Sequence, residues 1–120
     1  MAKVLIVDDE KILTTAYELV LSKDRHKVFI ANRPQDGLDL VAQEHPDVLL
    51  LDMLMPDMNG IEFLKALRKK KLKVPVILGF SNIENEEVIR AAKKLGIKEY
   101  LLKVNYTPRQ IADLVATLAK

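Results

Sequence analysis

Three acidic side chains directly follow two short apolar segments of the sequence. Asp8 and Asp9 come after residues 4–7, and Asp52 comes after residues 48–51. Continuous apolar runs of this length are typical of strands that are buried on both faces of a parallel sheet. Ligands bind outside the carboxyl ends of such strands in open α/β sheets. We therefore predict that Asp52 is a reactive carboxylate in a site at this edge.

Two further polar side chains are expected at the same edge. Ser81 follows the fourth apolar segment of the chain, and Lys103 follows the fifth. Carboxylates about 4 Å apart repel each other by roughly 4 kcal/mol at an effective dielectric constant of 20. Lys103 offsets part of this repulsion, and a divalent cation offsets it better. Mg²⁺ prefers such oxygen ligands, and Mn²⁺ or Ca²⁺ can substitute, while a solvated acidic cluster without an ion is the alternative.

The composition of this site suits phosphoryl transfer, which needs a nucleophile, a metal and donors that hold the phosphate oxygens. Asp52 is the candidate nucleophile, and its phosphorylation gives an acyl phosphate. Asp9 is expected to hold the metal directly and Asp8 partly through water. Lys103 is expected to pair with a phosphate oxygen, and the Ser81 hydroxyl to hydrogen-bond the phosphate.

The remaining sequence supplies the elements that bring these groups together. Strands are predicted at residues 4–7, 28–30, 48–51, 75–78 and 100–102, each followed by a segment of helical periodicity. Five strands that alternate with five helices predict an α/β fold, a doubly wound parallel sheet covered on both faces as a (βα)5 three-layer sandwich. The length favours the flavodoxin-like strand order 2-1-3-4-5.

The helices are predicted from their ends and from the spacing of apolar residues. Asn32 and Thr107 are expected to cap the second and fifth helices, and Gly96 to end a fourth helix over residues 84–95. The inward-facing residues are expected to be Ile12, Ala16, Leu19 and Val20 in the first helix, Leu38, Val41 and Ala42 in the second, Ile61, Leu64 and Leu67 in the third, Val88, Ala91, Ala92 and Leu95 in the fourth, and Ile111, Leu114, Val115 and Leu118 in the fifth.

Composition limits the class of protein. The chain has 120 residues, which is one ordinary domain, and it has no cysteine, which excludes disulfides and thiolate chemistry. No apolar run has the ~20 residues of a membrane span and no signal peptide is recognisable, so a cytoplasmic protein without membrane contact is expected. Because the net charge is only +2, the composition gives no reason to expect a nucleic acid partner. The basic run at residues 68–73 is interpreted as a solvated helix end rather than an anion-binding patch.

The ordered set of polar residues resembles a known family. Asp8 and Asp9, the motif that runs from Asp52 through Pro56 to Gly60, and then Ser81, Tyr100 and Lys103 are similar to the receiver domain of bacterial two-component response regulators, including the chemotaxis receivers. The resemblance covers the entire chain, residues 1–120, and implies a single receiver domain. The chain is either a stand-alone receiver or the front of a longer protein.

The resemblance implies a signalling switch rather than a metabolic enzyme. A histidine kinase or phosphotransfer protein would donate a phosphoryl group to Asp52 with Mg²⁺ bound by Asp8, Asp9, Asp52 and the backbone carbonyl of Leu54. The hydroxyl of Ser81 would then move toward the phosphate and Tyr100 would turn inward. This would reshape the face formed by the fourth helix, the fifth strand and the fifth helix. A downstream protein would recognise that face, with the chain a monomer or a phosphorylation-dependent dimer.

Three departures from the family pattern are visible. Ser81 lies six residues after Pro75 rather than five, so either a bulge near Gly79 or an earlier proline must absorb one residue, or Phe80 takes the hydroxyl position. Val104 replaces the usual cis proline after Lys103, so a trans bond is expected there.

The third departure concerns the lifetime of the phosphorylated state. Leu54 and Ile83 are apolar at positions that flank the phosphate in the family. Apolar side chains there should hinder an attacking water molecule. We therefore expect slow autodephosphorylation.

Three other functions remain as alternatives. A phosphatase of the haloacid dehalogenase type also uses an aspartate nucleophile, but it needs a second Asp where Leu54 stands. A flavin or nucleotide carrier can share the fold, but the four glycines form no phosphate-binding loop. A receiver that no longer accepts phosphate is the third alternative, and the complete set of acids and Lys103 argues against it.

Overall fold

The computed structural model describes residues 1–119 of the chain, with strands and helices in strict alternation. The elements are β1 (Lys3–Val7), α1 (Lys11–Lys23), β2 (Lys27–Ala31), α2 (Pro34–Glu44), β3 (Val48–Asp52), α3 (Gly60–Lys69), β4 (Val76–Ser81), α4 (Glu86–Lys94), β5 (Glu99–Leu102), a short 3₁₀ helix η1 (Lys103–Asn105) and α5 (Pro108–Leu118). No helix within the described part of the chain is long and apolar enough to cross a membrane.

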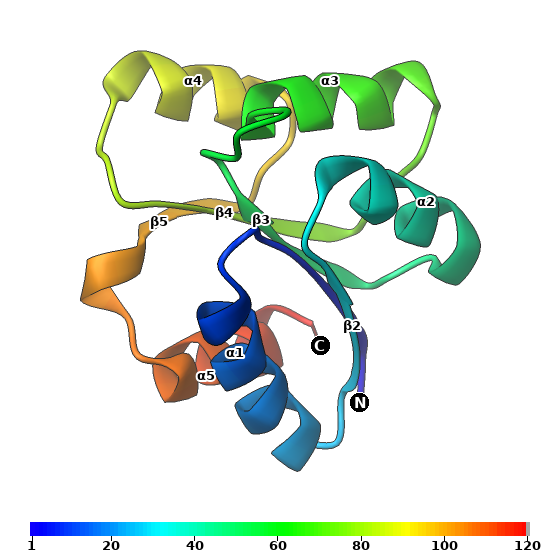
Figure 1. The fold of residues 1–120 in the computed structure, drawn as a ribbon, viewed down its shortest axis with the longest axis vertical. Coiled ribbons are helices and arrows are strands. Elements are labelled where there is room, and N and C mark those ends of the chain that lie inside the picture. Colours follow the sequence, from blue (N-terminus) through cyan, green and yellow to red (C-terminus); the bar gives the residue numbers. More distant parts are fainter. Residues whose placement is uncertain (120) are drawn as a thin grey trace.

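The strands form one parallel sheet in the order β2-β1-β3-β4-β5. Figure 1 shows α1 and α5 on one face of this sheet and α2, α3 and α4 on the other. The arrangement confirms the predicted flavodoxin-like fold and its strand order. β1 and β3 are neighbours, so the acidic residues that follow them emerge side by side.

The central strand β3 explains the long apolar run in the sequence. All of its residues are buried. Leu49 and Leu51 point into the core under α2, α3 and α4, while Val48 and Leu50 point into the core under α1 and α5. Because successive side chains of a strand point to opposite faces, a strand between two cores is apolar throughout. β3 ends at Asp52, which places this carboxylate at the carboxyl edge of the sheet.

The predicted buried face of α1 is wrong at two of its four residues, Ile12 and Leu19, whereas Ala16 is half-buried and Val20 packs against the core. Ile12 is 90% exposed and Leu19 is also exposed, whereas the buried residues of α1 are Thr14, Tyr17 and Leu21. The Tyr17 ring packs near Phe80 in the core under α1 and α5, with ring centroids 6.0 Å apart. Burial of this large ring sets the orientation of the helix and turns Ile12 toward solvent.

Other helix details also differ from the predictions. Asn32 does not cap α2, because its side-chain amide donates to the backbone carbonyl of Asp8 over 2.9 Å and Arg33 occupies the N-cap position. Ala42 is exposed rather than inward-facing. α4 begins two residues later than predicted, because the Asn85 side chain accepts from the amides of Glu87 and Val88.

The predicted ends of two helices are confirmed. Thr107 and Gln110 form a reciprocal capping box at the start of α5. Gly96 follows α4 with a φ of 105°, a left-handed conformation that favours glycine.

The pairing of β4 with its neighbours shows how the chain accommodates the six-residue spacing between Pro75 and Ser81. β4 pairs without interruption, residue for residue, from Val48–Val76 to Asp52–Phe80 on one side, and Ser81 pairs with Leu102 on the other. No bulge at Gly79 is present in this pairing. The strand simply extends further past Pro75 than predicted, and its last residue is Ser81. The Lys103–Val104 peptide bond is trans, as expected, since none of the peptide bonds described is cis.

Candidate functional site

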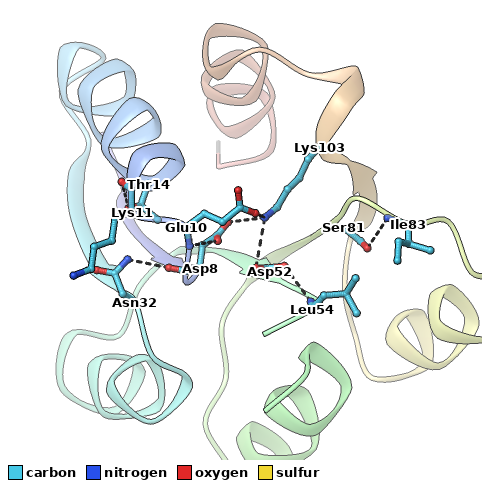
Figure 2. A network of polar contacts seen from close by, with 10 residues as sticks. All are labelled: Asp8, Glu10, Lys11, Thr14, Asn32, Asp52, Leu54, Ser81, Ile83 and Lys103. Carbon is cyan, nitrogen blue, oxygen red and sulfur yellow. Dashed lines mark hydrogen bonds and ion pairs between the residues drawn. The ribbon is translucent and has the colours of Figure 1, made fainter. Parts of the chain in front are cut away.

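A lysine ammonium group lies between three carboxylates at the carboxyl edge of the sheet. The Nζ atom of Lys103 is 3.0 Å from Asp8 Oδ2, 2.8 Å from Glu10 Oε1 and 3.5 Å from Asp52 Oδ2. Only 7% of the Lys103 side chain is exposed. Figure 2 shows these side chains reaching one another from the ends of β1, β3 and β5. The predicted convergence of strand ends therefore brings Asp8, Asp52 and Lys103 into direct contact.

Asp52 is fixed by the loop that follows β3. Its Oδ1 atom accepts a hydrogen bond from the Leu54 amide over 3.0 Å, which leaves Oδ2 facing Lys103. Next to it, the Met53 amide donates to the Phe80 carbonyl over 2.7 Å. Asp52 is only 3% exposed. The Leu54 amide therefore fixes one oxygen of a buried carboxylate, and the other oxygen faces Lys103.

The close approach of α3 to this loop requires a glycine. The Gly60 amide donates to the Met53 carbonyl over 3.0 Å. A Cβ atom on Gly60 would lie 2.8 Å from the Met53 Cα atom and overlap the Met53 side chain. Backbone atoms cannot rotate away as a flexible side chain can. The sequence motif that runs from Asp52 to Gly60 thus reflects packing of α3 directly against the residue after the candidate nucleophile.

The acidic residues after β1 occupy two different environments. Asp8 is buried, and its Oδ1 atom accepts from the Glu10 amide over 2.9 Å while its Oδ2 atom pairs with Lys103. Asp9 is exposed and lies near enough to Asp52 for its side chain to raise the Asp52 pKa. Glu10 is exposed, yet its carboxylate reaches Lys103.

The role of Glu10 was missed by the sequence analysis. The only available signal was its place as the third acid in the run that begins at Asp8. Helical position alone does not show that its side chain turns toward Lys103, some 93 residues away in the chain.

Burial and charge shift the pKa of both central groups. Loss of hydration raises the Asp52 pKa to about 7, and the Asp8 carboxylate adds to this, against the opposing effects of the Leu54 amide and Lys103. Burial also disfavours the Lys103 ammonium, but its ion pairs with Glu10, Asp52 and Asp8 outweigh that cost and keep the Lys103 pKa above its ordinary value. The site therefore holds a firmly charged cation beside a carboxylate that resists ionisation.

The donor set fits a hard divalent cation. One oxygen atom each from Asp8, Glu10 and Asp52 lies within 4.8 Å of the others. Carboxylate oxygens at such spacing are ligands that Mg²⁺, Mn²⁺ and Ca²⁺ accept. This cluster contains Glu10, whereas Asp9 was predicted from the sequence. Leu54 contacts Asp52 through its backbone amide, whereas its carbonyl was the predicted metal ligand. The assignment of Asp9 and the Leu54 carbonyl as ligands stays a prediction.

Ser81 and Tyr100 are joined through one residue of the β4–α4 loop. The Ser81 hydroxyl is buried and accepts from the Ile83 amide over 3.0 Å, and the Tyr100 hydroxyl donates to the Ile83 carbonyl over 3.3 Å. Figure 2 shows Ser81 at the same edge as Asp52, with its hydroxyl turned toward Ile83. Tyr100 is half-buried. Hydrogen bonds thus connect the site edge to the surface of β5.

Comparison with known proteins agrees with this geometry. A family model described as the response regulator receiver domain matches residues 4–116. The structure is similar to the chemotaxis protein CheY4 of Vibrio cholerae, with 28% sequence identity and a TM-score of 0.88 over 98% of each chain. It is also similar to the receiver domain of the Francisella response regulator 1452, with 25% identity and a TM-score of 0.87 over 99% of this chain and 97% of that one. The chain belongs to the response regulator receiver domain family.

Proposed function

We propose that Asp52 accepts a phosphoryl group from a histidine kinase or phosphotransfer protein in a Mg²⁺-dependent reaction. Receiver domains act as phosphorylation switches in two-component systems and interact with histidine kinases and downstream effectors. The observation that carries the proposal for this chain is the Lys103 ammonium 3.5 Å from Asp52 Oδ2 in a buried acidic site. A cation held there can neutralise an incoming phosphate.

The reaction forms one bond and breaks one. A carboxylate oxygen of Asp52 attacks phosphorus, and the bond from phosphorus to the donor nitrogen breaks as the imidazole leaves. Lys103 is already oriented by Asp8 and Glu10, so it can hold a phosphate oxygen without a large rearrangement. The nucleophile must be ionised, and in the metal-free protein burial opposes this by raising the Asp52 pKa to about 7.

A bound Mg²⁺ ion supplies charge neutralisation for the carboxylates and for the phosphate oxygens. Asp8, Glu10 and Asp52 form the cluster that would hold it, and Asp9 is the ligand predicted from the sequence in place of Glu10. Burial of Asp52 and the nearby Asp8 carboxylate both raise the Asp52 pKa, and this unfavourable ionisation is the physical reason to expect a cation there. Mn²⁺ or Ca²⁺ can substitute, since the ligands are all oxygen atoms.

The signal would leave the site through the β4–α4 loop. A phosphate on Asp52 offers new acceptors to the Ser81 hydroxyl, which in this structure accepts from the Ile83 amide. Movement of Ser81 toward the phosphate would release Ile83 and so affect the Tyr100 hydroxyl bound to its carbonyl. The face of α4, β5 and α5 would then change its affinity for a downstream protein. A cytoplasmic location stays a prediction from the sequence.

Intact-mass measurement tests the proposal directly. The protein is incubated with acetyl phosphate and Mg²⁺, and one phosphoryl adduct is expected. The adduct should be absent in Asp52→Asn and present in Asp57→Asn, a matched change at an exposed acid of the same loop. Absence of an adduct with acetyl phosphate, phosphoramidate and a phosphorylated histidine kinase would contradict it. Steady hydrolysis of phosphate esters would instead indicate a phosphatase.

A further inference from the structure

A second concave surface lies away from the acidic site, between the carboxyl-terminal ends of α3 and α4. We call it the α3–α4 groove, and its volume is about 860 Å³. Figure 1 shows the two helices next to each other on one face of the sheet. Because each helix runs antiparallel to the strands it joins, this end of the helices lies at the opposite edge of the sheet from Asp52. The floor consists of Leu64, Leu67, Leu72, Val74, Ile77 and Leu95.

The rim of the groove is strongly basic. Arg68, Lys71 and Lys73 line it. The two segments that form the groove, residues 63–75 and 88–98, hold ten of the 19 basic side chains and none of the 17 acidic ones. The rest of the chain therefore carries every carboxylate and only nine basic side chains. The net charge of the chain is only +2, yet its basic and acidic side chains are concentrated in different parts of the sequence.

Within the described part of the chain, the basic side chains of these segments form no ion pair with an acidic side chain. Among residues 1–119 the ion pairs involve only Lys3, Lys103 and Arg109 as cations. The Arg68 guanidinium donates to the Lys94 carbonyl over 3.3 Å, which joins the ends of α3 and α4 and fixes one wall of the groove. Charge complementarity therefore favours an anionic occupant.

The apolar floor narrows the class of occupant. The floor residues are buried or half-buried, and none of the exposed large apolar side chains belongs to the groove. A membrane surface needs apolar side chains that project outward, and these are recessed. Single-stranded nucleic acid needs aromatic rings for base stacking, and no aromatic residue lines the groove. The occupant must instead insert its own apolar side chains between two cationic edges.

We propose that the α3–α4 groove binds an acidic peptide segment of a partner protein that inserts bulky apolar side chains onto the floor and sets carboxylates against Arg68, Lys71 and Lys73. The volume lies within the range of about 300–1,000 Å³ that is usual for specific ligand sites. Such a partner leaves the opposite edge of the sheet free. We therefore expect binding at the groove in the unphosphorylated protein.

Peptide selection against the unphosphorylated protein tests this proposal. A random library of displayed 12-residue peptides is selected on the wild-type protein and counter-selected on Lys71→Glu/Lys73→Glu. We expect enrichment of peptides in which Leu, Phe or Met is flanked by Asp or Glu. A synthetic peptide from this set should bind at least tenfold more weakly to Lys71→Glu/Lys73→Glu, and more weakly at high salt. Lys23→Glu/Lys27→Glu, an equal charge change elsewhere, should leave the affinity within about twofold.

A floor variant and a direct map complete the test. Leu72→Ala should weaken peptide binding several-fold, with its folding checked by melting temperature, and amide shifts of Leu72 and Leu95 should move on titration. The proposal is overturned if no peptide is enriched over the charge-reversed variant, or if the shifts fall elsewhere. Binding of a 20-nucleotide DNA or of phosphatidylserine vesicles without any acidic peptide would overturn it too. So would self-association of the protein through this groove.

Discussion

Asp52 is held in an environment that opposes its negative charge. Its carboxylate is buried, it faces Asp8 and Asp9, and only Lys103 and the Leu54 amide compensate it. This environment makes the ionised form of Asp52 unfavourable in the metal-free protein. This cost can be measured as a dependence of stability on pH.

We expect the unfolding free energy of the metal-free protein to fall as pH rises from about 4 to about 7. The folded-state pKa of Asp52 is raised from 3.8 to about 7, so the folded protein binds more protons than the unfolded chain in this window. Stability from protonated Asp52 is complete below the unfolded pKa and is lost as pH passes the folded pKa. Asp52→Asn, which cannot ionise, should be more stable than wild type by about 1–3 kcal/mol at pH 8 and nearly equal at pH 4. Urea unfolding in chelator across this range measures the difference, and a gap that does not change with pH would contradict it.

The two apolar residues beside the site should lengthen the life of an acyl phosphate. Leu54 and Ile83 are 50% and 59% exposed, so they border the site without covering it fully. Leu54→Asn introduces an amide that can orient a water molecule by one hydrogen bond of about 1 kcal/mol, which corresponds to roughly fivefold faster hydrolysis. Decay of the phosphoryl adduct, followed by intact mass, checks this. Leu54→Met is the control and should leave the decay rate unchanged, whereas equal rates in all three proteins would argue against the idea.

At the scale of elements, α3 depends on the absence of a side chain at its first residue. Gly60→Ala places a Cβ against the backbone of Met53, so α3 or the loop after Asp52 must shift. We expect a loss of about 1–3 kcal/mol, typical of overpacking a buried site. Lys65→Ala, an exposed change in the same helix, should stay within about 0.5 kcal/mol of wild type. Chemical denaturation of both variants decides the matter, and equal stability would show that the contact relaxes freely.

Strand positions could be predicted from the sequence because the sheet is buried on both faces. β1 and β3 lie between two cores, so their apolar runs are continuous and their ends are marked by acids. The alternation with helices then fixes which ends share an edge. The sequence pattern therefore predicts correctly that Asp8, Asp52 and Lys103 lie together.

Helix faces were harder to predict, because an apolar side chain need not be buried. Ile12 and Leu19 gave α1 a plausible apolar stripe, yet packing of Tyr17 beside Phe80 decides its orientation. Contacts between residues far apart in the chain were likewise not predictable from the sequence pattern. Glu10 reaches Lys103 only because the start of α1 and the end of β5 meet in space, and the position of Ser81 was decided by pairing of β4 with its neighbours.

At the scale of the whole molecule, charge is separated between two ends. Carboxylates gather around Asp52, while the ends of α3 and α4 are basic. At the acidic end, burial and like charge disfavour the ionised form of Asp52. A ligand that binds only the folded state stabilises it by mass action. A cation that binds the acidic end should therefore raise the unfolding free energy of the whole domain.

Mg²⁺ should raise the melting temperature of the wild-type protein. At a concentration of about ten times its dissociation constant, Mg²⁺ adds about 1.4 kcal/mol, which corresponds to roughly 5 °C for a domain of this size. In chelator, Asp52→Ala and Asp9→Ala should melt above wild type because the repulsion is reduced, and added Mg²⁺ should narrow the gap. Glu10→Gln separates the two possible ligand sets, since loss of the Mg²⁺ response there would assign the ion to the cluster of Asp8, Glu10 and Asp52. If wild type, Asp52→Ala and Asp9→Ala all respond equally to Mg²⁺, the ion binds elsewhere and the acidic edge is not its site.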